Sequence, residues 1–265
     1  MKPVFNLHQG TSPLLVSVPH AGTHIPSDMR DLFTPQALEV HDTDWHLDLL
    51  YDYVKTQNAS LMVPQHSRYV IDLNRPPDGA AMYPDANNTG LCPVTDFYGE
   101  SIYQAGSAPD AIQIAQRITQ YWKPYHDALA SELARIRALH GYAVLFDGHS
   151  IKSQVPWLFE GKLPDLNIGT ANGASCAANL REAVAQLLAG QREFTSVMDG
   201  RFKGGYITRQ YGRPAQGIHA VQLEMCWSTY MQESPPYVLD AQRQARIHPV
   251  LKGLTSLLAS VVPHG

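Results

Sequence analysis

The sequence predicts an α/β fold, a three-layer α/β/α sandwich built around a mostly parallel, mixed sheet. Short apolar runs of strand length alternate along the chain with longer stretches of helical periodicity, which is the pattern of this class. The clearest strand is uninterrupted and apolar, as a strand covered on both faces must be. Polar clusters also follow the predicted strands directly, where proteins of this class bind their ligands.

The predicted strands are short and apolar. Leu14–Val18 stops at Pro19, as a buried strand would. Tyr142–Phe146 (YAVLF) has no polar interruption and is expected to be covered on both faces of the sheet. Four shorter runs complete the predicted sheet, namely Leu61–Val63, Tyr69–Leu73, Thr195–Met198 and Ala220–Leu223.

Helix signals separate these strands. Pro109–His140 has apolar residues at helical spacing and Gly141 in the stop position, and Pro124 is expected to kink or divide this helix. The other predicted helices begin at Thr34-Pro35 and at Asp42-Thr43, and cover Ser175–Leu188 and about Asp240–Val261. From Asn74 to about Gly106 the chain is rich in Pro, Gly, Asn and Asp, so a long functional loop is expected there.

Length and composition predict one soluble domain covering residues 1–265. A chain of 265 residues can bury a full core, and no linker or repeat divides this sequence. The net charge of -4 and the pI near 6.3 argue against a surface for nucleic acid or an anionic membrane. Three cysteines without C-x-x-C spacing argue against disulfides and a thiolate zinc site. Without an apolar leader, the protein is expected in the cytoplasm, acting on a small molecule.

Five polar clusters lie where an α/β fold binds its ligands. They are Pro19–Gly22 (PHAG), His41–His46 (HDTDWH), Ile71–Arg75 (IDLNR), Asp147–Ser150 (DGHS) and Gln222–Glu224 (QLE). Each cluster alone has an ordinary structural explanation, such as a helix cap or an ion pair at a strand end. Because all of them fall at the ligand-binding edge of one sheet, they together predict a functional site.

Two histidines and a carboxylate from separate clusters suit a catalytic zinc ion, which takes three protein ligands and leaves one position for water. We predict that His20, Asp44 and His149 bind one divalent metal ion, with Zn²⁺ as the expected metal. Asp147 is placed to orient a ligand imidazole from behind. Glu224, at the end of a predicted strand, is the candidate general base that carries a proton to the leaving amine.

In this order, PHAG, HDTDWH, residues 67–75 (SRYVIDLNR) and DGHS resemble the N-formylglutamate amidohydrolase family. The resemblance implies hydrolysis of N-formyl-L-glutamate to formate and L-glutamate in histidine catabolism. It also implies a fold akin to the zinc carboxypeptidases and aspartoacylases, which hold zinc through a His-x-x-Glu pair and a later His. Here Thr23 occupies the position of that Glu, so the carboxylate ligand must come from elsewhere, and Asp42 and Glu39 are alternatives to Asp44.

The implied substrate carries two carboxylates and only a small formyl group, so its recognition would be mostly anionic. An arginine side chain binds a carboxylate through two parallel hydrogen bonds. Arg75, beside the predicted metal site, is expected to bind one carboxylate and to assist catalysis, with Asn74 next to it. Arg209 is the candidate for the second carboxylate, and Arg68 and Arg213 are the alternatives.

Other functions fit parts of this pattern. The facial triad of non-haem iron oxygenases also uses two His and one Asp, but with an all-β scaffold and close His-x-Asp spacing. Ser150 lies in DGHSI and not in a Gly-x-Ser-x-Gly elbow, which argues against a serine hydrolase. A related zinc hydrolase for another N-acyl or γ-glutamyl amide would need the same metal and arginines. A carboxylate-binding module that is not an enzyme would keep the arginines alone.

Overall fold

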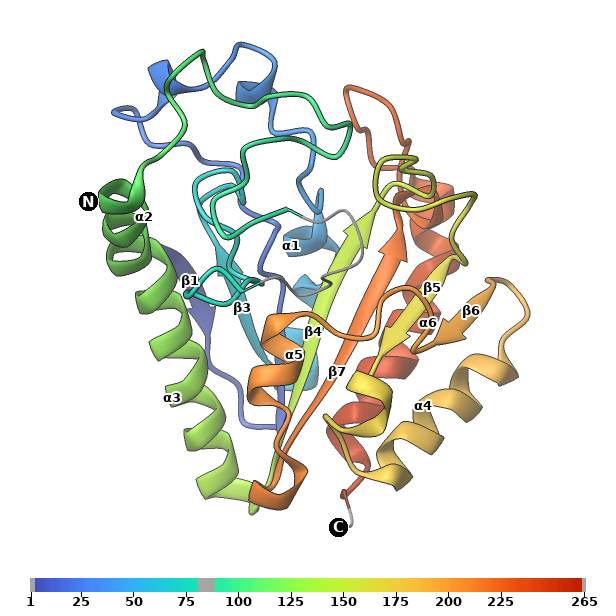
Figure 1. Cartoon of the computed structure of the whole chain (residues 1–265). Coiled ribbons are helices and arrows are strands. Elements are labelled where there is room, and N and C mark those ends of the chain that lie inside the picture. The colour runs from blue at the N-terminus through green and yellow to red at the C-terminus, as the bar shows by residue number, and fades with distance from the viewer. Residues whose placement is uncertain (1–2, 81–88, 264–265) are drawn as a thin grey trace.

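The computed structural model describes residues 3–80 and 89–263, and its strands form one seven-stranded sheet (Figure 1). In spatial order the strands are β1, β3, β2, β4, β7, β5 and β6. Their bounds are β1 Phe5–His8, β2 Leu14–Ser17, β3 Ser60–Pro64, β4 Ala143–Ile151, β5 Leu166–Gly169, β6 Ser196–Met198 and β7 Ile218–Cys226. The predicted α/β class is therefore confirmed as a mixed sheet with helices.

Most neighbouring strands run parallel. β2 pairs in parallel with both β3 and β4, and β4 pairs in parallel with β7. β5 and β6 are also parallel, whereas β1 is antiparallel to β3 and β5 is antiparallel to β7. Parallel pairing brings the carboxyl ends of β2, β4 and β7 to one edge of the sheet, where most of the predicted polar clusters begin.

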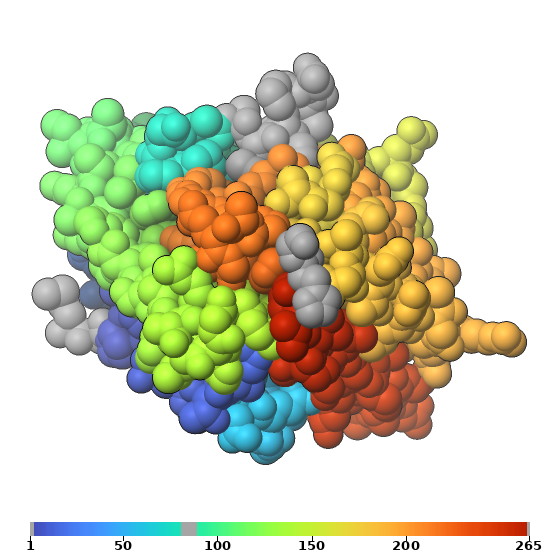
Figure 2. All heavy atoms as spheres, turned by 90° about the horizontal axis from the view of Figure 1, so that it is seen from below, coloured from blue at the N-terminus to red at the C-terminus, as the bar shows by residue number. Residues whose placement is uncertain are grey.

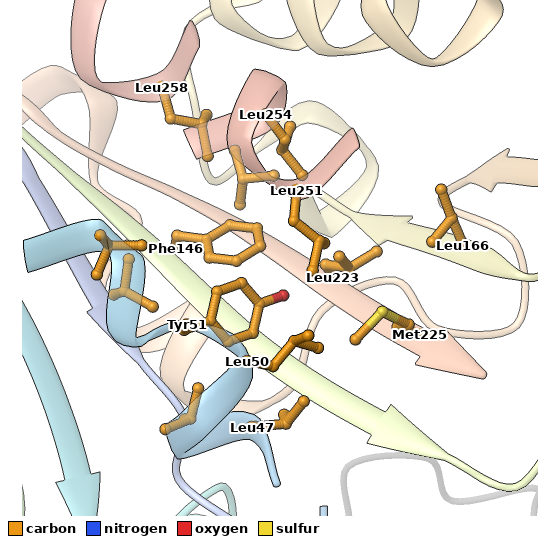
Figure 3. Packing of buried hydrophobic residues seen from close by; sticks show 14 of the residues in the cluster. Leu47, Leu50, Tyr51, Phe146, Leu166, Leu223, Met225, Leu251, Leu254 and Leu258 are labelled. Carbon is orange, nitrogen blue, oxygen red and sulfur yellow. The ribbon is translucent and has the colours of Figure 1, made fainter. Parts of the chain in front are cut away.

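Helices cover both faces of the sheet (Figure 1). The α-helices are α1 Leu47–Leu50, α2 Ala111–Arg117, α3 Lys123–His140, α4 Ala178–Gly190, α5 Tyr206–Tyr211 and α6 Ala241–Ser260. Phe146 of β4 packs with Tyr51 and with Leu254 of α6 on one face (Figure 3). Its neighbour Leu145 points to the other face and packs in a second core with residues of α3 and α5. Seen from below, α4 and α6 lie against each other (Figure 2).

Pro124 divides the long predicted helix, as expected. A π-helical turn, Ile118–Trp122, separates α2 from α3. Proline has no N–H and its ring collides with the carbonyl four residues earlier, so regular α-helical hydrogen bonding cannot continue through this position. At the other end α3 stops at Gly141, whose φ of 80° is in the left-handed region, as the stop signal predicts.

The prediction of a strand at Tyr69–Leu73 is wrong. The segment is a buried loop. The N–H of Val70 donates to the carbonyl of Ser67, and the N–H of Asp72 donates to the carbonyl of Leu91. Its apolar side chains fill the core beneath the loop, which produces a strand-like pattern without pairing in the sheet. This loop carries Asp72, Asn74 and Arg75 towards the edge of the sheet.

Other local predictions differ in extent. The sequence pattern does not predict β1, β5 or α5, because each is six residues or shorter and β5 contains the buried polar Asn167. The helix expected at Thr34-Pro35 is only a 3-10 turn at Ala37–Glu39. Asp42-Thr43 does not cap α1. The helix begins after His46, and it is His46 that adopts a left-handed conformation, with φ of 61°.

The predicted long loop has neither helix nor strand in its described parts, residues 74–80 and 89–106. Residues 81–88 of the same loop lie outside the described residues. Across the described ranges, no helix combines the length and the apolar character that crossing a membrane requires. The three cysteine thiols, Cys92, Cys176 and Cys226, are free and buried.

Candidate metal centre and active site

The predicted chemical residues meet at the carboxyl edge of the sheet. His20 follows the end of β2, His149 lies in the part of β4 that continues past the predicted strand, and Glu224 lies near the end of β7. Because β4 and β7 are parallel, His149 and Glu224 occupy the same register position on adjacent strands. Backbone pairing alone therefore places a histidine beside a carboxylate.

His20, Asp44 and His149 form a buried cluster that could hold a metal ion, with one ligand atom from each within 4.8 Å of the others. Oδ2 of Asp44 lies 3.1 Å from Nδ1 of His149 and 3.8 Å from Nδ1 of His20. Metal bonds of about 2.0–2.1 Å in tetrahedral geometry separate two ligand atoms by roughly 3.3 Å, so these spacings suit zinc. The N–H of Ser150 donates to the same Asp44 oxygen and holds it in place.

The alternative carboxylates lie elsewhere. Oδ2 of Asp42 accepts a hydrogen bond from the N–H of Phe97, and Glu39 forms an exposed ion pair with His41. Burial raises the pKa of Asp42 to about 7. The structure thus brings Asp44, and neither Asp42 nor Glu39, to the two histidines.

Both histidines are held from behind by carboxylates. Nε2 of His20 lies 2.7 Å from Asp72, and Nε2 of His149 lies 3.0 Å from Asp147. At His20, an N–H at Nε2 that donates to Asp72 leaves the lone pair of Nδ1 facing Asp44, which is the tautomer a metal ligand needs. Asp147 was predicted in this orienting position, whereas the matching role of Asp72 was not.

The charges at the site favour a cation between the ligands. Burial opposes protonation of His149, but the Asp147 and Asp44 carboxylates outweigh it and raise the pKa of His149 well above its ordinary value. At Asp72 burial opposes ionisation, yet His20 and Arg68 hold the pKa of that carboxyl well below its usual range. The carboxylates around His149 therefore favour a positive charge at this point. A divalent cation would supply that charge.

Glu224 has the environment of a general base. Its carboxylate is buried beside the cluster, and no described residue donates a hydrogen bond to it. Burial raises the pKa of Glu224 to about 8, opposed by the nearby charge of His149. A carboxyl group that titrates near neutral pH can both accept and return a proton.

A cavity of about 680 Å³, counting the solvent at its mouth, opens onto these residues. Its apolar wall is formed by Phe97, Ile151, Leu158 and Phe202. Apart from the cluster, its polar lining includes Asn74, Gln222 and three arginines. A mostly apolar cavity with a few converging polar groups is typical of a small-molecule site.

The lining arginines are Arg68, Arg75 and Arg201. Nη2 of Arg68 donates to Asp72 at 2.7 Å, which makes Arg68 part of the support for His20. Arg75 donates from Nε to the carbonyl of Thr89 and from Nη1 to the carbonyl of Asn74, so its guanidinium is anchored at the cavity wall.

Arg209 is not brought to the described lining of the cavity. It is exposed on α5, where its Nε donates to the carbonyl of Gly204. Thr208 points inward and donates to Asp147 at 2.9 Å, so the next residue along the short helix points outward. Arg201, which precedes α5, lines the cavity instead, and no motif in the sequence distinguishes it from a surface arginine.

Asn74 is fixed on all sides. Its side-chain oxygen accepts a hydrogen bond from the N–H of Ile207, which turns its amide nitrogen to within 3.0 Å of Nε2 of His149. The segment around it is held from α3 and the π-helical turn. Trp122 donates from Nε1 to the carbonyl of Arg75, and Nε2 of His126 donates to the carbonyl of Leu73. Trp122 belongs to the π-helical turn that precedes Pro124, so this irregular turn contributes a hydrogen bond to the segment of the site.

Comparison with known proteins identifies the family of this chain. The profile described as N-formylglutamate amidohydrolase matches residues 12–231. N-formylglutamate deformylase from Pseudomonas putida is 46% identical over 258 residues, covering 97% of this chain and 96% of that protein. The chain belongs to the N-formylglutamate amidohydrolase family. A second relative, N-formylglutamate deformylase from Pseudomonas aeruginosa, is 44% identical over 98% of this chain and 97% of its own length.

Solved structures agree with this family fold. N-formylglutamate amidohydrolase from Ralstonia eutropha JMP134 superposes with a TM-score of 0.82 at 24% identity, covering 97% of both chains. The gene product Atu2144 of Agrobacterium tumefaciens gives a TM-score of 0.73 at 20% identity, covering 97% of this chain and 95% of that chain. The mixed α/β sheet also differs from the all-β scaffold of facial-triad oxygenases. The hydroxyl of Ser150 is hydrogen-bonded to that of Tyr230, and among the described contacts no histidine acts on it as a base.

Proposed function

We propose that this amidohydrolase cleaves N-formyl-L-glutamate to formate and L-glutamate, using one divalent metal ion, Zn²⁺. The convergence of His20, Asp44 and His149 beside Glu224 in one cavity is the observation that carries the proposal. The curated relatives at 46% and 44% identity are both N-formylglutamate deformylases, and each is covered almost completely by this chain.

The metal would be held by His20, Asp44 and His149. The fit rests on the two Nδ1 atoms that face one carboxylate oxygen, and on the carboxylates behind both imidazoles. A bound Zn²⁺ would polarise the formyl carbonyl and lower the pKa of its water molecule to near neutrality. The protein supplies the orientation of the ligands and a largely buried setting in which such charges act strongly.

Glu224 would transfer a proton from the attacking water to the leaving amine. Its carboxylate accepts a proton from the water that attacks the formyl carbon. It then returns the proton to the amine nitrogen of glutamate as the C–N bond breaks. Burial raises the pKa of Glu224 and so makes it a stronger base than an exposed carboxylate, which suits this role.

Arg75 and Asn74 would position the substrate. Arg75 lines the cavity, and its guanidinium plane is fixed there by Thr89 and the carbonyl of Asn74, so a positive charge stands where a substrate carboxylate can approach. Asn74 touches His149 and therefore lies close to the scissile bond. Arg201 replaces Arg209 in the proposal as the second cation of the cavity.

Formate release from N-formyl-L-glutamate, with and without a chelator, tests this function. We expect release that the chelator abolishes and that Zn²⁺ restores, with much slower hydrolysis of N-acetyl-L-glutamate. Metal analysis of the purified protein distinguishes the alternative functions. Iron would indicate an oxygenase, and a metal-free protein that binds glutamate would indicate a binding module. Preference for an N-acyl or γ-glutamyl amide would assign the chain to a related zinc hydrolase.

Broader assignments follow from the same proposal. We propose a three-layer α/β/α sandwich of the zinc-carboxypeptidase kind, supported by the two apolar cores on opposite faces of the sheet. One domain over 1–265 is supported by α6, which lies beyond the matched residues 12–231 and packs into the same core as β2 and β4. The reaction would belong to histidine catabolism in the cytoplasm, a compartment that suits three free thiols.

A further inference from the structure

Gln222 shares a face of the sheet with the chemical residues but has no part in the chemistry described so far. It lies two positions before Glu224 on β7, so both side chains point to the same side. In the parallel pairing Gln222 is level with Asp147, as Glu224 is level with His149. It is 97% buried, with 3% of its surface exposed, and it lines the cavity.

The orientation of the Gln222 amide is fixed. The N–H of Gly205 donates to Oε1 of Gln222 at 2.7 Å, so this atom must be the oxygen and the other must be the NH₂ group. Asn74 packs directly against Gly205, where an added Cβ would lie 2.3 Å from the amide nitrogen of Asn74, so only glycine fits at this position. Nε2 of Gln222 has no hydrogen-bond acceptor among the described residues. Because Gln222 lines the cavity and its oxygen is already held by Gly205, its NH₂ group is available to donate to a ligand there.

The distance of Gln222 from the level of Glu224 and His149 indicates which carboxylate of the substrate it can reach. Two residues along a strand correspond to roughly 6.6 Å, so Gln222 lies about that far below the level of Glu224 and His149. In N-formylglutamate two single bonds of about 1.5 Å link the amide nitrogen to the α-carboxylate carbon, but four link it to the side-chain carboxylate carbon. Only the side-chain carboxylate, roughly 5 Å away along an extended chain, matches this depth.

We propose that Gln222 is a specificity residue, whose Nε2 donates a hydrogen bond to the side-chain carboxylate of the substrate. This inference rests on the proposed function and adds the group that selects glutamate. Arg201 lines the same cavity and supplies positive charge for a buried carboxylate. A fixed donor with no other partner rejects substrates that lack an acceptor at this position, because its hydrogen bond then remains unmade.

Gln222→Met tests the proposal, because methionine has nearly the same length and no N–H. Formate release is measured with N-formyl-L-glutamate and with N-formyl-L-norvaline, which has an equally long chain without the carboxylate. We expect the ratio of the two kcat/KM values to fall by roughly 10- to 100-fold, the usual worth of a hydrogen bond to a charged group. Gln210→Met, exposed on α5 and outside this cavity, is the matched control and should keep the wild-type ratio.

Calorimetric binding of L-glutamate and L-norvaline to the same proteins provides a readout that does not need turnover. A selective loss of glutamate affinity in Gln222→Met supports the inference, even if the wild-type protein were to release no formate and the proposed function were to fail. Equal losses for both ligands, or no change in either ratio, would overturn the inference and leave the deformylase function standing. Thermal unfolding and metal content, measured for each variant, identify a general loss of structure, which weakens both ligands equally.

Discussion

His149 and Glu224 are register partners across the parallel strands β4 and β7. Adjacent strands lie about 4.8 Å apart, so the sheet itself sets the spacing between a candidate metal ligand and the candidate base. Neither residue depends on a flexible loop for its position, and both are buried. Catalytic groups on strands are held more accurately than groups on loops, which suits a reaction that requires a fixed base beside a bound carbonyl.

Glu224→Gln should retain the metal and substrate affinity but lower kcat by roughly 10² to 10⁴, the usual contribution of a general acid or base. Glutamine is isosteric and cannot carry the proton. The measurement is steady-state formate release together with the metal content of the purified variant. Loss of the metal would instead make Glu224 a ligand and give Asp44 another role.

His20→Ala and His149→Ala should each abolish metal retention and activity while the fold persists. Each imidazole faces the cluster and is backed by a carboxylate, so its removal opens the site without creating a large apolar cavity. Metal content and circular dichroism check this result. His140→Ala, exposed on α3, is the control, and a His20 or His149 variant with full zinc and normal turnover would refute the assignment.

The position of the site could be predicted because parallel strands deliver their carboxyl ends to one edge. His20 and Glu224 were recognisable from short apolar runs that stop at polar residues, and His149 from the run before it. The family motifs added the order of the clusters. Local sequence patterns alone are therefore sufficient to predict where these three residues lie in the fold.

Tertiary structure determines what the sequence could not show. The loop at Tyr69–Leu73 is apolar because it is buried, and only the folded chain reveals that Asp72 turns back to His20. No motif marks Arg201 as a cavity residue, and only the orientation of α5 shows that Arg209 points outward. Choices of this kind depend on packing between distant segments, which periodicity does not encode.

Trp122→Phe should raise KM for N-formyl-L-glutamate by roughly 2- to 10-fold, the worth of one neutral hydrogen bond. The change removes the donor to the carbonyl of Arg75 but keeps a ring that stacks on His126. Metal content should not change. Tyr121→Phe, in the same π-helical turn, controls for general effects on the helix. A lower melting temperature with unaltered KM would show that Trp122 only stabilises the fold.

The stability of the metal-free protein should decrease with acidity through His126. Burial lowers the pKa of this imidazole to about 4, whereas the unfolded chain binds a proton below about pH 6.5. Between these values the unfolded state binds more protons, so stability falls as the pH falls, by about 2 kcal/mol from pH 7 to pH 5. Urea unfolding of chelator-treated protein should show a smaller pH dependence in His126→Gln than in wild type. Exposed His140→Gln should keep the wild-type dependence, and equal slopes in all three proteins would rule out His126 as the cause.

Arg75→Lys should lower kcat/KM for N-formyl-L-glutamate by roughly 10- to 100-fold, although the charge is retained. Lysine offers one compact ammonium group, whereas Arg75 has a planar guanidinium held in place by Thr89 and the carbonyl of Asn74. A misplaced carboxylate would move the formyl carbon away from the metal centre and from Glu224. Exposed Arg209→Lys should have a smaller effect, and the reverse order would restore Arg209 as the carboxylate ligand.

A second substrate shows whether Arg75 acts through the carboxylate. A formylated amine without the carboxylate never uses this contact, so Arg75→Lys should slow its hydrolysis much less than that of N-formyl-L-glutamate. Comparing both substrates in both proteins forms a cycle that isolates the interaction between the guanidinium and the carboxylate. Equal losses for the two substrates would mean that Arg75 supports the loop around Asn74 or polarises the formyl oxygen. In that case the carboxylate-binding group would have to be sought at Arg201, because both other arginines of the lining form ion pairs with Asp72.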